Sequence, residues 1–388
     1  MNHTSYDIIL IGGGMMGLSL AARLSPYEFR IAVVELELPL LAWNSTDYDA
    51  RVSALTLSSA YFLQQCGVWE KILPGSLSPL HHMTVWDELG GGKIEFDRDD
   101  MAQDQLGFIV ENRAIVKALY EEVQHRVTFY CPAKPQSLVI TEEYADLQLE
   151  EGTVLRAPLL IGADGAHSWL RAHQPFECSE KSYDQSAIVA VIECEKPHNG
   201  TAFQNFLPTG PLGVLPLANP HQVAIVWSTS APNLSEDAFD EHLTQAVGHR
   251  LGRMRCLQAP RLISLVERHV TRYSQPHVVL MGDAAHTLHP LAGQGANLGF
   301  ADSEQLSQLL IEAKQVGKTF WSEKIMRRYE RARKSENALM LGIMRVFKEL
   351  FAEENPALVK LRSFGFNVCD RQRWIKQFFM RQMEKHSV

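Results

Sequence analysis

Apolar positions near the start of the chain fall into short continuous runs separated by a helical pattern. Residues 6–11 are apolar and rich in β-branched side chains, which is typical of a strand buried in a parallel sheet. Glycines follow, then a helical pattern over about 14–24, and then a second apolar run at 31–34 that ends at Glu35. This order predicts a βαβ unit, and therefore an α/β domain, at the N-terminus.

The pattern changes in the middle of the chain, where apolar and polar residues alternate. Segments such as 187–193 and 223–228 show this alternation, with turn residues between them, which predicts antiparallel strands. Short apolar strands return at 153–163 and 277–282, so the first domain is discontinuous. Beyond residue 301 the pattern is mostly helical.

We therefore expect an α/β fold with α+β character, in which an antiparallel-sheet domain is inserted into a Rossmann-like domain and helices follow at the C-terminus. The expected limits are 1–75, 108–180 and 266–325 for the Rossmann-like domain, 76–107 and 181–265 for the inserted domain, and 326–388 for the C-terminal helical region.

Composition narrows the class of protein. The chain has 388 residues, of which 46% are hydrophobic and 21% charged, as in an ordinary globular protein with a large core. Its net charge of −8 argues against a nucleic-acid binder. The six cysteines form no C-x-x-C pair, so we expect free thiols and no metal site. The apolar stretch 8–22 is broken by glycines and is shorter than the roughly 20 residues of a membrane span, so we expect a cytoplasmic protein.

The first motif with chemical meaning is G-x-G-x-x-G, formed by Gly12, Gly14 and Gly17 between the first strand and the first helix. Gly12 permits the tight turn, Gly14 lets the backbone approach a pyrophosphate, and Gly17 lets helix and strand pack closely. Glu35 lies at the end of the second strand, where a carboxylate binds ribose hydroxyls. The motif indicates a dinucleotide but does not separate NAD from FAD.

Two further motifs lie near residue 290. One is Gly282-Asp283-Ala284-Ala285-His286, after an apolar strand, and the other runs from Pro290 to Asn297. Glycines followed by a helix start create an anion-binding helix terminus, which suits the negative charge of a reduced flavin. The side chain of Asp283 is able to accept hydrogen bonds from a sugar-alcohol chain.

Together with Asp164-Gly165, these motifs resemble those of class A flavoprotein monooxygenases, the para-hydroxybenzoate hydroxylase superfamily. The resemblance covers nearly the whole chain and implies an FAD-dependent aromatic-ring monooxygenase that uses NAD(P)H as reductant and O2 as co-substrate, through a flavin C4a-hydroperoxide. It implies that Glu35 holds the adenosine ribose, Asp283 the ribityl chain, and Asp164 the pyrophosphate region and the reductant.

The same resemblance assigns further cofactor contacts. Arg51 matches an arginine placed near the flavin, whereas Asn112 stands where many relatives have Arg or Gln. The loop from Pro290 to Asn297 would face the isoalloxazine, through Pro290, Gly293, Gly295, Ala296 and Asn297.

Within the superfamily the chain looks like a ubiquinone-biosynthesis hydroxylase. The segments that carry this likeness are 49–55, 106–112, 183–187, 210–217 and 288–299. Residues 250–252 look closest to the 2-polyprenyl-6-methoxyphenol hydroxylase branch, whereas Ser264-Leu265 departs from the Pro-Leu of relatives. The branch implies hydroxylation at ring carbon C4, giving 2-polyprenyl-6-methoxy-1,4-benzoquinol.

Several assignments stay open at this point. His289, His286 and Tyr183 are weak acid–base candidates, each with a structural alternative. A greasy substrate needs an apolar channel, and its candidate lining, with core packing as the alternative, is Phe203, Phe206, Leu212, Val214 and Leu215.

The C-terminal segment 360–388 mixes basic and aromatic residues. This composition suits peripheral contact with an inner membrane or a place in a multi-enzyme ubiquinone-synthesis complex, with a plain core-packed helix as the alternative. The other functions left open are a hydroxylase of a soluble aromatic, a non-catalytic flavoprotein subunit and an NAD-only dehydrogenase.

Overall fold

The N-terminal βαβ unit forms the centre of a six-stranded sheet, whose strands β2, β3 and β13 are buried along their whole length. All neighbouring strands in this sheet are parallel except β20 and β21. The strand order is β20 (Ser274–Gln275), β21 (Val278–Leu280), β13 (Leu159–Gly162), β2 (Ile8–Ile11), β3 (Ile31–Val34) and β9 (Thr128–Tyr130).

The computed structural model describes residues 3–44, 49–101, 103–230, 236–287, 293–352, 355–372 and 376–377. Beside the six-stranded sheet pack α1 (Met15–Leu24), α4 (Asn112–Val123) and α7 (Gly295–Gln315). A four-stranded sheet shares the same hydrophobic core through residues such as Leu147 and Leu155. Its order is β1 (His3–Ser5), β12 (Val154–Ala157), β11 (Ala145–Leu149) and β10 (Pro135–Ile140).

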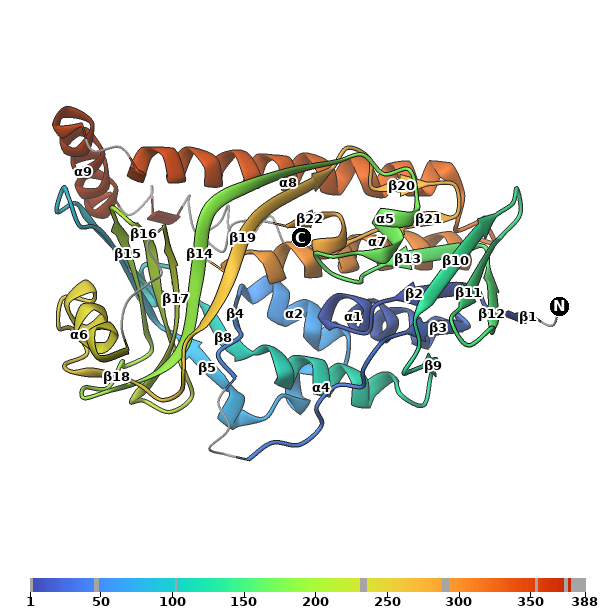
Figure 1. The fold of residues 1–388 in the computed structure, drawn as a ribbon, viewed down its shortest axis with the longest axis horizontal. Helices are drawn as coiled ribbons and strands as arrows, with labels where there is room; N and C mark the ends of the chain where they lie inside the picture. Colours follow the sequence, from blue (N-terminus) through green and yellow to red (C-terminus); the bar gives the residue numbers. More distant parts are fainter. Residues whose placement is uncertain are drawn as a thin grey trace.

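The second region is built on a large, strongly bent sheet (Figure 1). Its order is β22 (His286–Thr287), β19 (Arg261–Val270), β14 (Cys178–Cys194), β17 (Gln222–Thr229), β16 (Gly210–Pro216), β15 (Thr201–Leu207), β6 (His82–Asp87) and β7 (Lys93–Asp97), and β18 (Met254–Cys256) pairs with β14. On it lies α6 (Glu236–Ala246).

The expectation of a purely antiparallel sheet needs one correction, because β6 and β15 are parallel. Such a pair needs a long connection, and the chain between these strands passes through the Rossmann-like region before it returns. A small separate sheet, β4 (Val52–Leu55), β8 (Gly107–Glu111) and β5 (Leu77–Leu80), joins the two regions with α2 (Leu57–Gln65).

Two long strands, β14 and β19, extend from one region into the other (Figure 1). The sequence-based domain limits at 180/181 and 265/266 therefore fall inside strands, and these limits stay a prediction. Short helices, α3 (Arg98–Met101) and α5 (Trp169–His173), complete the part before the C-terminal helices.

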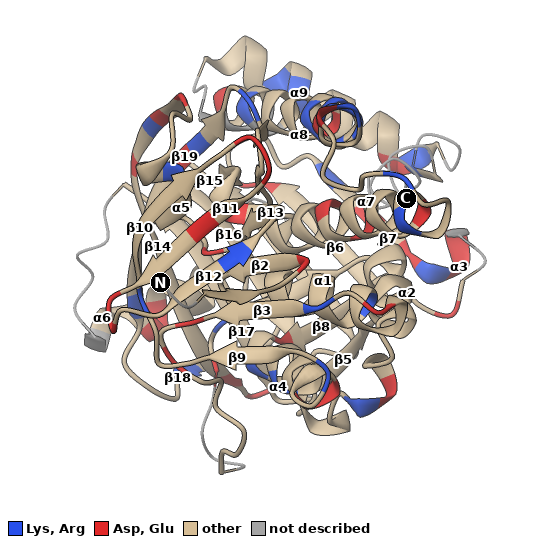
Figure 2. Ribbon diagram, turned by 90° about the vertical axis from the view of Figure 1, so that its right-hand side faces the viewer, with Lys and Arg blue, Asp and Glu red and all other residues tan. Residues whose placement is uncertain are grey.

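The C-terminal helices are α8 (Glu323–Ala352), which runs along one side of the molecule, and α9 (Pro356–Arg371), which lies at the end of the large sheet (Figure 1). A buried ion pair holds α9 in place, since Nε and Nη2 of Arg362 each donate to the Asp87 carboxylate at 2.8 Å. Among the described helices, none combines the length and the apolarity needed to cross a membrane. Acidic and basic residues are interspersed over the ribbon (Figure 2).

Candidate active site

Four of the predicted site residues follow neighbouring strands of the six-stranded sheet. Gly12 comes after β2, Glu35 after β3, Asp164 after β13 and Asp283 after β21. Because these strands are adjacent and parallel, the residues lie along one edge of the sheet. The carboxyl edge of such a sheet is where ligands bind in doubly wound folds.

The three motif glycines have different physical reasons to be glycine. Gly12 has φ +106°, and a side-chain carbon there would overlap the backbone of Ala163. A side-chain carbon at Gly17 would overlap the Gly12 carbonyl, so β2 and α1 need both glycines to pack. At Gly14, in contrast, such a carbon would meet no described protein atom within 4 Å. The protein itself therefore does not require glycine at this position, whereas close approach of a pyrophosphate does.

The Glu35 carboxylate is turned towards the glycine loop. Its two oxygens accept the N–H groups of Gly13 and Leu36, the latter at 2.7 Å. These bonds hold the carboxylate at the end of β3, in the position that binds ribose hydroxyls in dinucleotide-binding proteins.

Asp164 and Asp283 are carboxylates in desolvated surroundings. Oδ1 of Asp164 is buried with no hydrogen-bond partner in the described part of the chain, whereas Oδ2 accepts the Leu170 N–H at 3.2 Å. Burial raises the pKa of Asp164, and it also raises the pKa of Asp283, although the Asp283 side chain is reached by solvent. The buried Oδ1 of Asp164 would gain from a hydroxyl group of a ligand, because an unsatisfied buried acceptor is costly. The exposed Asp283 carboxylate is accessible to such a hydroxyl group.

Arg171 links the loops that carry these two carboxylates. Its guanidinium donates to the Ala284 carbonyl at 2.8 Å and to the Ala166 carbonyl at 2.5 Å. The sequence showed this arginine after Asp164-Gly165, but only the structure shows that it fixes one loop against the other.

Arg51 and Asn112 lie together, since the Asn112 N–H donates to the Arg51 carbonyl at 3.0 Å. The Asn112 side chain accepts the Ser53 hydroxyl at 2.7 Å, so it stabilises the start of β4. The Arg51 side chain is exposed, and its charge is available to a diphosphate.

The Asn297 side chain has protein partners on both ends. Oδ1 accepts the Thr56 N–H at 3.0 Å and the Ser59 hydroxyl at 2.8 Å, and Nδ2 donates to the Ala54 carbonyl at 2.8 Å. Asn297 thus fastens α7 to the loop between β4 and α2. At this loop, the start of α7 around Gly293 (φ +62°), Gly295 and Ala296 offers the backbone N–H groups of a helix N-terminus, which suit an anionic ligand.

His289 and Pro290 lie outside the described residues, so their proposed roles stay predictions. His286 is buried, with Nε2 at 2.6 Å from the Asp302 carboxylate. This position fits its structural alternative. Burial, together with the hydrogen bond that its hydroxyl donates to Glu267, raises the pKa of Tyr183. Tyr183 therefore links β14 to β19 as a neutral phenol.

Sequence reasoning missed the buried ionic network around Asp302. One oxygen of Asp302 accepts the Gly282 N–H at 2.9 Å and contacts His286, and the other accepts Arg333 Nε of α8 at 2.7 Å. Burial alone would raise the pKa of Asp302, but His286 and Arg333 hold it well below its usual range. The network fixes the backbone just before Asp283. The local sequence gave no signal for this network, because the polar residues Ser303, Glu304 and Gln305 follow Asp302 directly.

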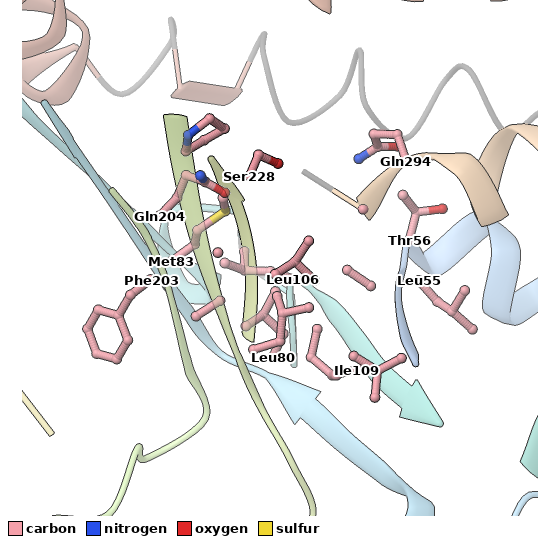
Figure 3. A pocket seen from close by; sticks show the side chains of 18 residues that line it. Leu55, Thr56, Leu80, Met83, Leu106, Ile109, Phe203, Gln204, Ser228 and Gln294 are labelled. Atoms are coloured by element: carbon pink, nitrogen blue, oxygen red, sulfur yellow. The ribbon is translucent and has the colours of Figure 1, made fainter. Parts of the chain in front are cut away.

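A cavity of about 180 Å³ lies between the small sheet of β4, β8 and β5 and the large sheet (Figure 3). One wall comes from this small sheet and from Gly293 and Gln294, next to the start of α7. The opposite wall comes from β6, β15, β16 and β17, and the lining is mostly apolar. None of the described lining residues has an ionisable side chain.

The expected channel lining was correct in part. Leu215 faces the cavity, whereas Leu212 and Val214, on the opposite face of β16, are buried against α6. Phe206 stacks on Phe351 with ring centroids 3.8 Å apart. The Phe203 backbone borders the cavity, but its ring points to the other side of the sheet (Figure 3). For these three residues and the Phe203 ring the alternative of core packing holds, because alternation alone does not say which face of a strand meets which neighbour.

The fold and the edge of the sheet define a dinucleotide-binding protein with a second, sheet-rich region that bounds a cavity. A model of the family "FAD binding domain" matches residues 5–338. The chain is 31% identical over 385 residues to 3-demethoxyubiquinol 3-hydroxylase of Escherichia coli (strain K12), covering 97% of this chain and 98% of that relative. It is 30% identical to the mitochondrial ubiquinone biosynthesis monooxygenase COQ6 of Homo sapiens, covering 97% and 92%.

The solved structure of p-nitrophenol 4-monooxygenase from Pseudomonas putida DLL-E4 has the same fold, with a TM-score of 0.83 at 19% identity, covering 100% of this chain and 99% of that one. This chain therefore belongs to the family of FAD-binding monooxygenases. The expected fold class, the cofactor FAD and the class of enzyme are thus confirmed.

Proposed function

We propose that this enzyme hydroxylates the aromatic ring of a prenylated phenol in ubiquinone biosynthesis. The observation that carries the proposal is the cavity between the large sheet and the small sheet beside the start of α7, because its described lining residues are mostly apolar and none of them is ionisable. A neutral, greasy ring is the ligand that such walls favour. The relatives named as ubiquinone-pathway hydroxylases support the same substrate class.

The residues at the edge fit FAD, since Gly14 leaves room for the pyrophosphate and Asp164 has a buried acceptor oxygen without a described partner. Glu35 would hold the ribose, Asp283 the ribityl chain, and the start of α7 the negative charge of the reduced ring system. When bound, FAD accepts a hydride from NAD(P)H and activates O2. The protein's part is to orient the phenol and to exclude water through the apolar side chains of the cavity.

The lining offers hydrogen bonds and no general base among its described residues. Hydroxylation of the ring therefore depends on a substrate whose own hydroxyl and alkoxy groups make the ring electron-rich. His289 stays a prediction for proton transfer.

The ring carbon is a separate question. The branch resemblance predicts hydroxylation at C4 of 2-polyprenyl-6-methoxyphenol, whereas the printed name of the Escherichia coli relative specifies a 3-hydroxylase of a demethoxyubiquinol. We retain the C4 step as the prediction for this chain, with the 3-position as the second candidate.

Lipid mass spectrometry of a strain that lacks this protein tests both the pathway and the ring carbon that is hydroxylated. Accumulation of a 2-polyprenyl-6-methoxyphenol supports the C4 step, and accumulation of a demethoxy-quinol moves the reaction to the other carbon. Normal ubiquinone in a strain without a redundant hydroxylase would contradict the pathway. Stimulation of NADPH oxidation by a phenol would separate an enzyme from a non-catalytic subunit.

We also propose that the enzyme meets the membrane through α9. The Arg362–Asp87 ion pair fixes this helix, yet Leu361 and Phe364 are 64% and 67% exposed on it, with Lys360 beside them. Exposed apolar residues next to basic ones suit the surface of an anionic membrane, from which a polyprenyl substrate would come.

Sedimentation with anionic liposomes tests this contact. The double variant Leu361→Ser, Phe364→Ser should stay in the supernatant while the original chain pellets, and a Leu262→Ser variant, changed at an exposed position on β19, should behave like the original chain. Equal sedimentation of all three would contradict a membrane role for α9. Association with other enzymes of the pathway stays a prediction, for which copurification is the measurement.

A further inference from the structure

Two polar side chains interrupt the apolar wall that the large sheet presents to the cavity. Gln204 lies on β15 and Ser228 on β17, and both are buried. Figure 3 shows their polar ends near each other at one end of the cavity, facing Gln294 and Thr56 across it. For neither the Gln204 amide nor the Ser228 hydroxyl does the described part of the protein supply a side-chain hydrogen-bond partner.

The polar atoms of both side chains are open to the cavity, since none of them is among the buried side-chain atoms that lack a partner in the described part of the chain. A ligand that displaces water from these atoms binds well only if it makes the hydrogen bonds that the water made. An amide and a hydroxyl on the same wall offer donors and acceptors of neutral character, which match a phenolic hydroxyl with a neighbouring alkoxy oxygen.

Gly213 lies next to the Gln204 amide. On the sheet it lies between Gln204 of β15 and Val226 of β17. A side-chain carbon at Gly213 would be in ordinary van der Waals contact, at 3.4 Å, with Gln204 Oε1, so the Gln204 amide lies over this backbone. Because Gly213 lines the cavity, the Gln204 amide forms part of the cavity wall there.

The other end of the cavity is apolar. Leu80, Leu106 and Ile109 gather there, away from Gln204 and Ser228 (Figure 3). With about 180 Å³ the cavity is smaller than the roughly 300–1,000 Å³ of pockets for drug-sized ligands, so it suits one aromatic head and not a long tail.

From this polarity we infer that Gln204 and Ser228 form the subsite for the oxygen-bearing side of the aromatic head, while the prenyl chain leaves past Leu80, Leu106 and Ile109. The inference rests on the proposed function and adds to it the orientation of the ring. Because two fixed points, a polar end and an apolar exit, define how the ring lies, Gln204 is a specificity-determining residue for the carbon that is hydroxylated.

The test compares two probes on the FAD-loaded enzyme, 2-methoxy-6-prenylphenol and the analogue without the phenolic hydroxyl. Binding is followed through the change in flavin absorbance. The original enzyme should prefer the phenol, and Gln204→Leu should weaken phenol binding about 3- to 10-fold, as expected for one lost hydrogen bond of about 1 kcal/mol, while binding of the analogue changes little. Ser228→Ala should reduce the same preference by less.

Gln308→Leu is the matched control, because Gln308 is exposed on α7 and its amide reaches only Glu312. A thermal melt and the flavin content show whether each variant is folded, and Ser228→Ala serves if Gln204→Leu is not. If the original enzyme prefers the phenol and both cavity variants keep that preference in full, the subsite is wrong while the proposed function stands. If the original enzyme binds neither probe, the substrate class is wrong and the subsite falls with it.

Discussion

The FAD-binding edge and the substrate-facing wall of the cavity differ in how the chain brings their residues together. At the edge, each contributing residue follows the end of its own strand, so Gly12, Glu35, Asp164 and Asp283 meet because parallel strands end together. On the wall, every second residue of several strands contributes, and register decides which ones meet. The edge therefore tolerates little change in local backbone, whereas the wall depends on which face of each strand is turned inward.

The two regions also differ in how they treat polar groups. Behind the edge, the buried charges of Asp302 on α7 and Arg333 on α8 are paired with each other. On the wall, the polar side chains of Gln204 and Ser228 are neutral. This difference suits a charged cofactor on one side and a neutral substrate on the other.

The largest effect is expected at the glycine loop, where two substitutions separate packing from ligand approach. Gly17→Val should prevent both stable folding and flavin binding, because its side chain would overlap the Gly12 carbonyl. Gly14→Val should fold but bind no flavin, because no protein atom lies near a side-chain carbon there. Circular dichroism measures folding, and absorbance near the flavin bands measures loading. A yellow, fully loaded Gly14→Val protein would refute the pyrophosphate assignment.

Next in size is the loss of the buried Asp302. Asp302→Ala leaves Arg333 buried without its carboxylate, which should lower the free energy of unfolding by about 3–5 kcal/mol. Glu323→Ala breaks the exposed pair with Arg327 on α8 and should cost only about 0–1 kcal/mol. Urea denaturation of both variants is the measurement, and equal costs would show that the network does not stabilise this edge.

The two faces of β16 offer a third comparison. Leu212→Ala creates a cavity in the core beneath α6 and should cost about 2–5 kcal/mol of stability with little change in KM. Leu215→Ala changes the substrate cavity, so it should cost less stability and raise KM. Thermal melts and steady-state kinetics distinguish the two. The face assignment fails if the two variants exchange these effects.

The smallest expected effect is a dependence of stability on pH through His269, in the strand that joins the regions. Burial, with the nearby His286 and Lys334, lowers the pKa of His269 to about 4, from an ordinary value near 6.5. Between these values the unfolded chain binds a proton that the folded chain does not, so stability should fall as the pH drops through this window. His269→Gln should flatten the fall in melting temperature. If the melting temperature of His269→Gln falls with pH as steeply as that of the original chain, His269 is not the source of the pH dependence.

Much of the edge could be predicted from the sequence, since a glycine motif, a strand-end acid and Asp283 each lie in a short segment whose geometry is local. The Asp302 network could not, because its partners come from β22, α7 and α8 and meet only after packing. The protein contacts of Asn297 could not be predicted either, because its amide bonds to Thr56, Ser59 and Ala54, which lie far from it in the sequence.

The sequence by itself determined a dinucleotide-binding βαβ unit at the N-terminus and the presence of a strand-rich second region, because these follow from local periodicity and from motifs of fixed spacing. The resemblance to a known family added FAD as the cofactor. The tertiary structure alone decided that β6 pairs parallel with β15, that Leu215 and not Leu212 faces the cavity, and that Gln204 and Ser228 line the same cavity. The physical reason is that side chains alternate faces with a period of two, so a pattern shows that a strand has two faces, and only its neighbours say which face meets the substrate.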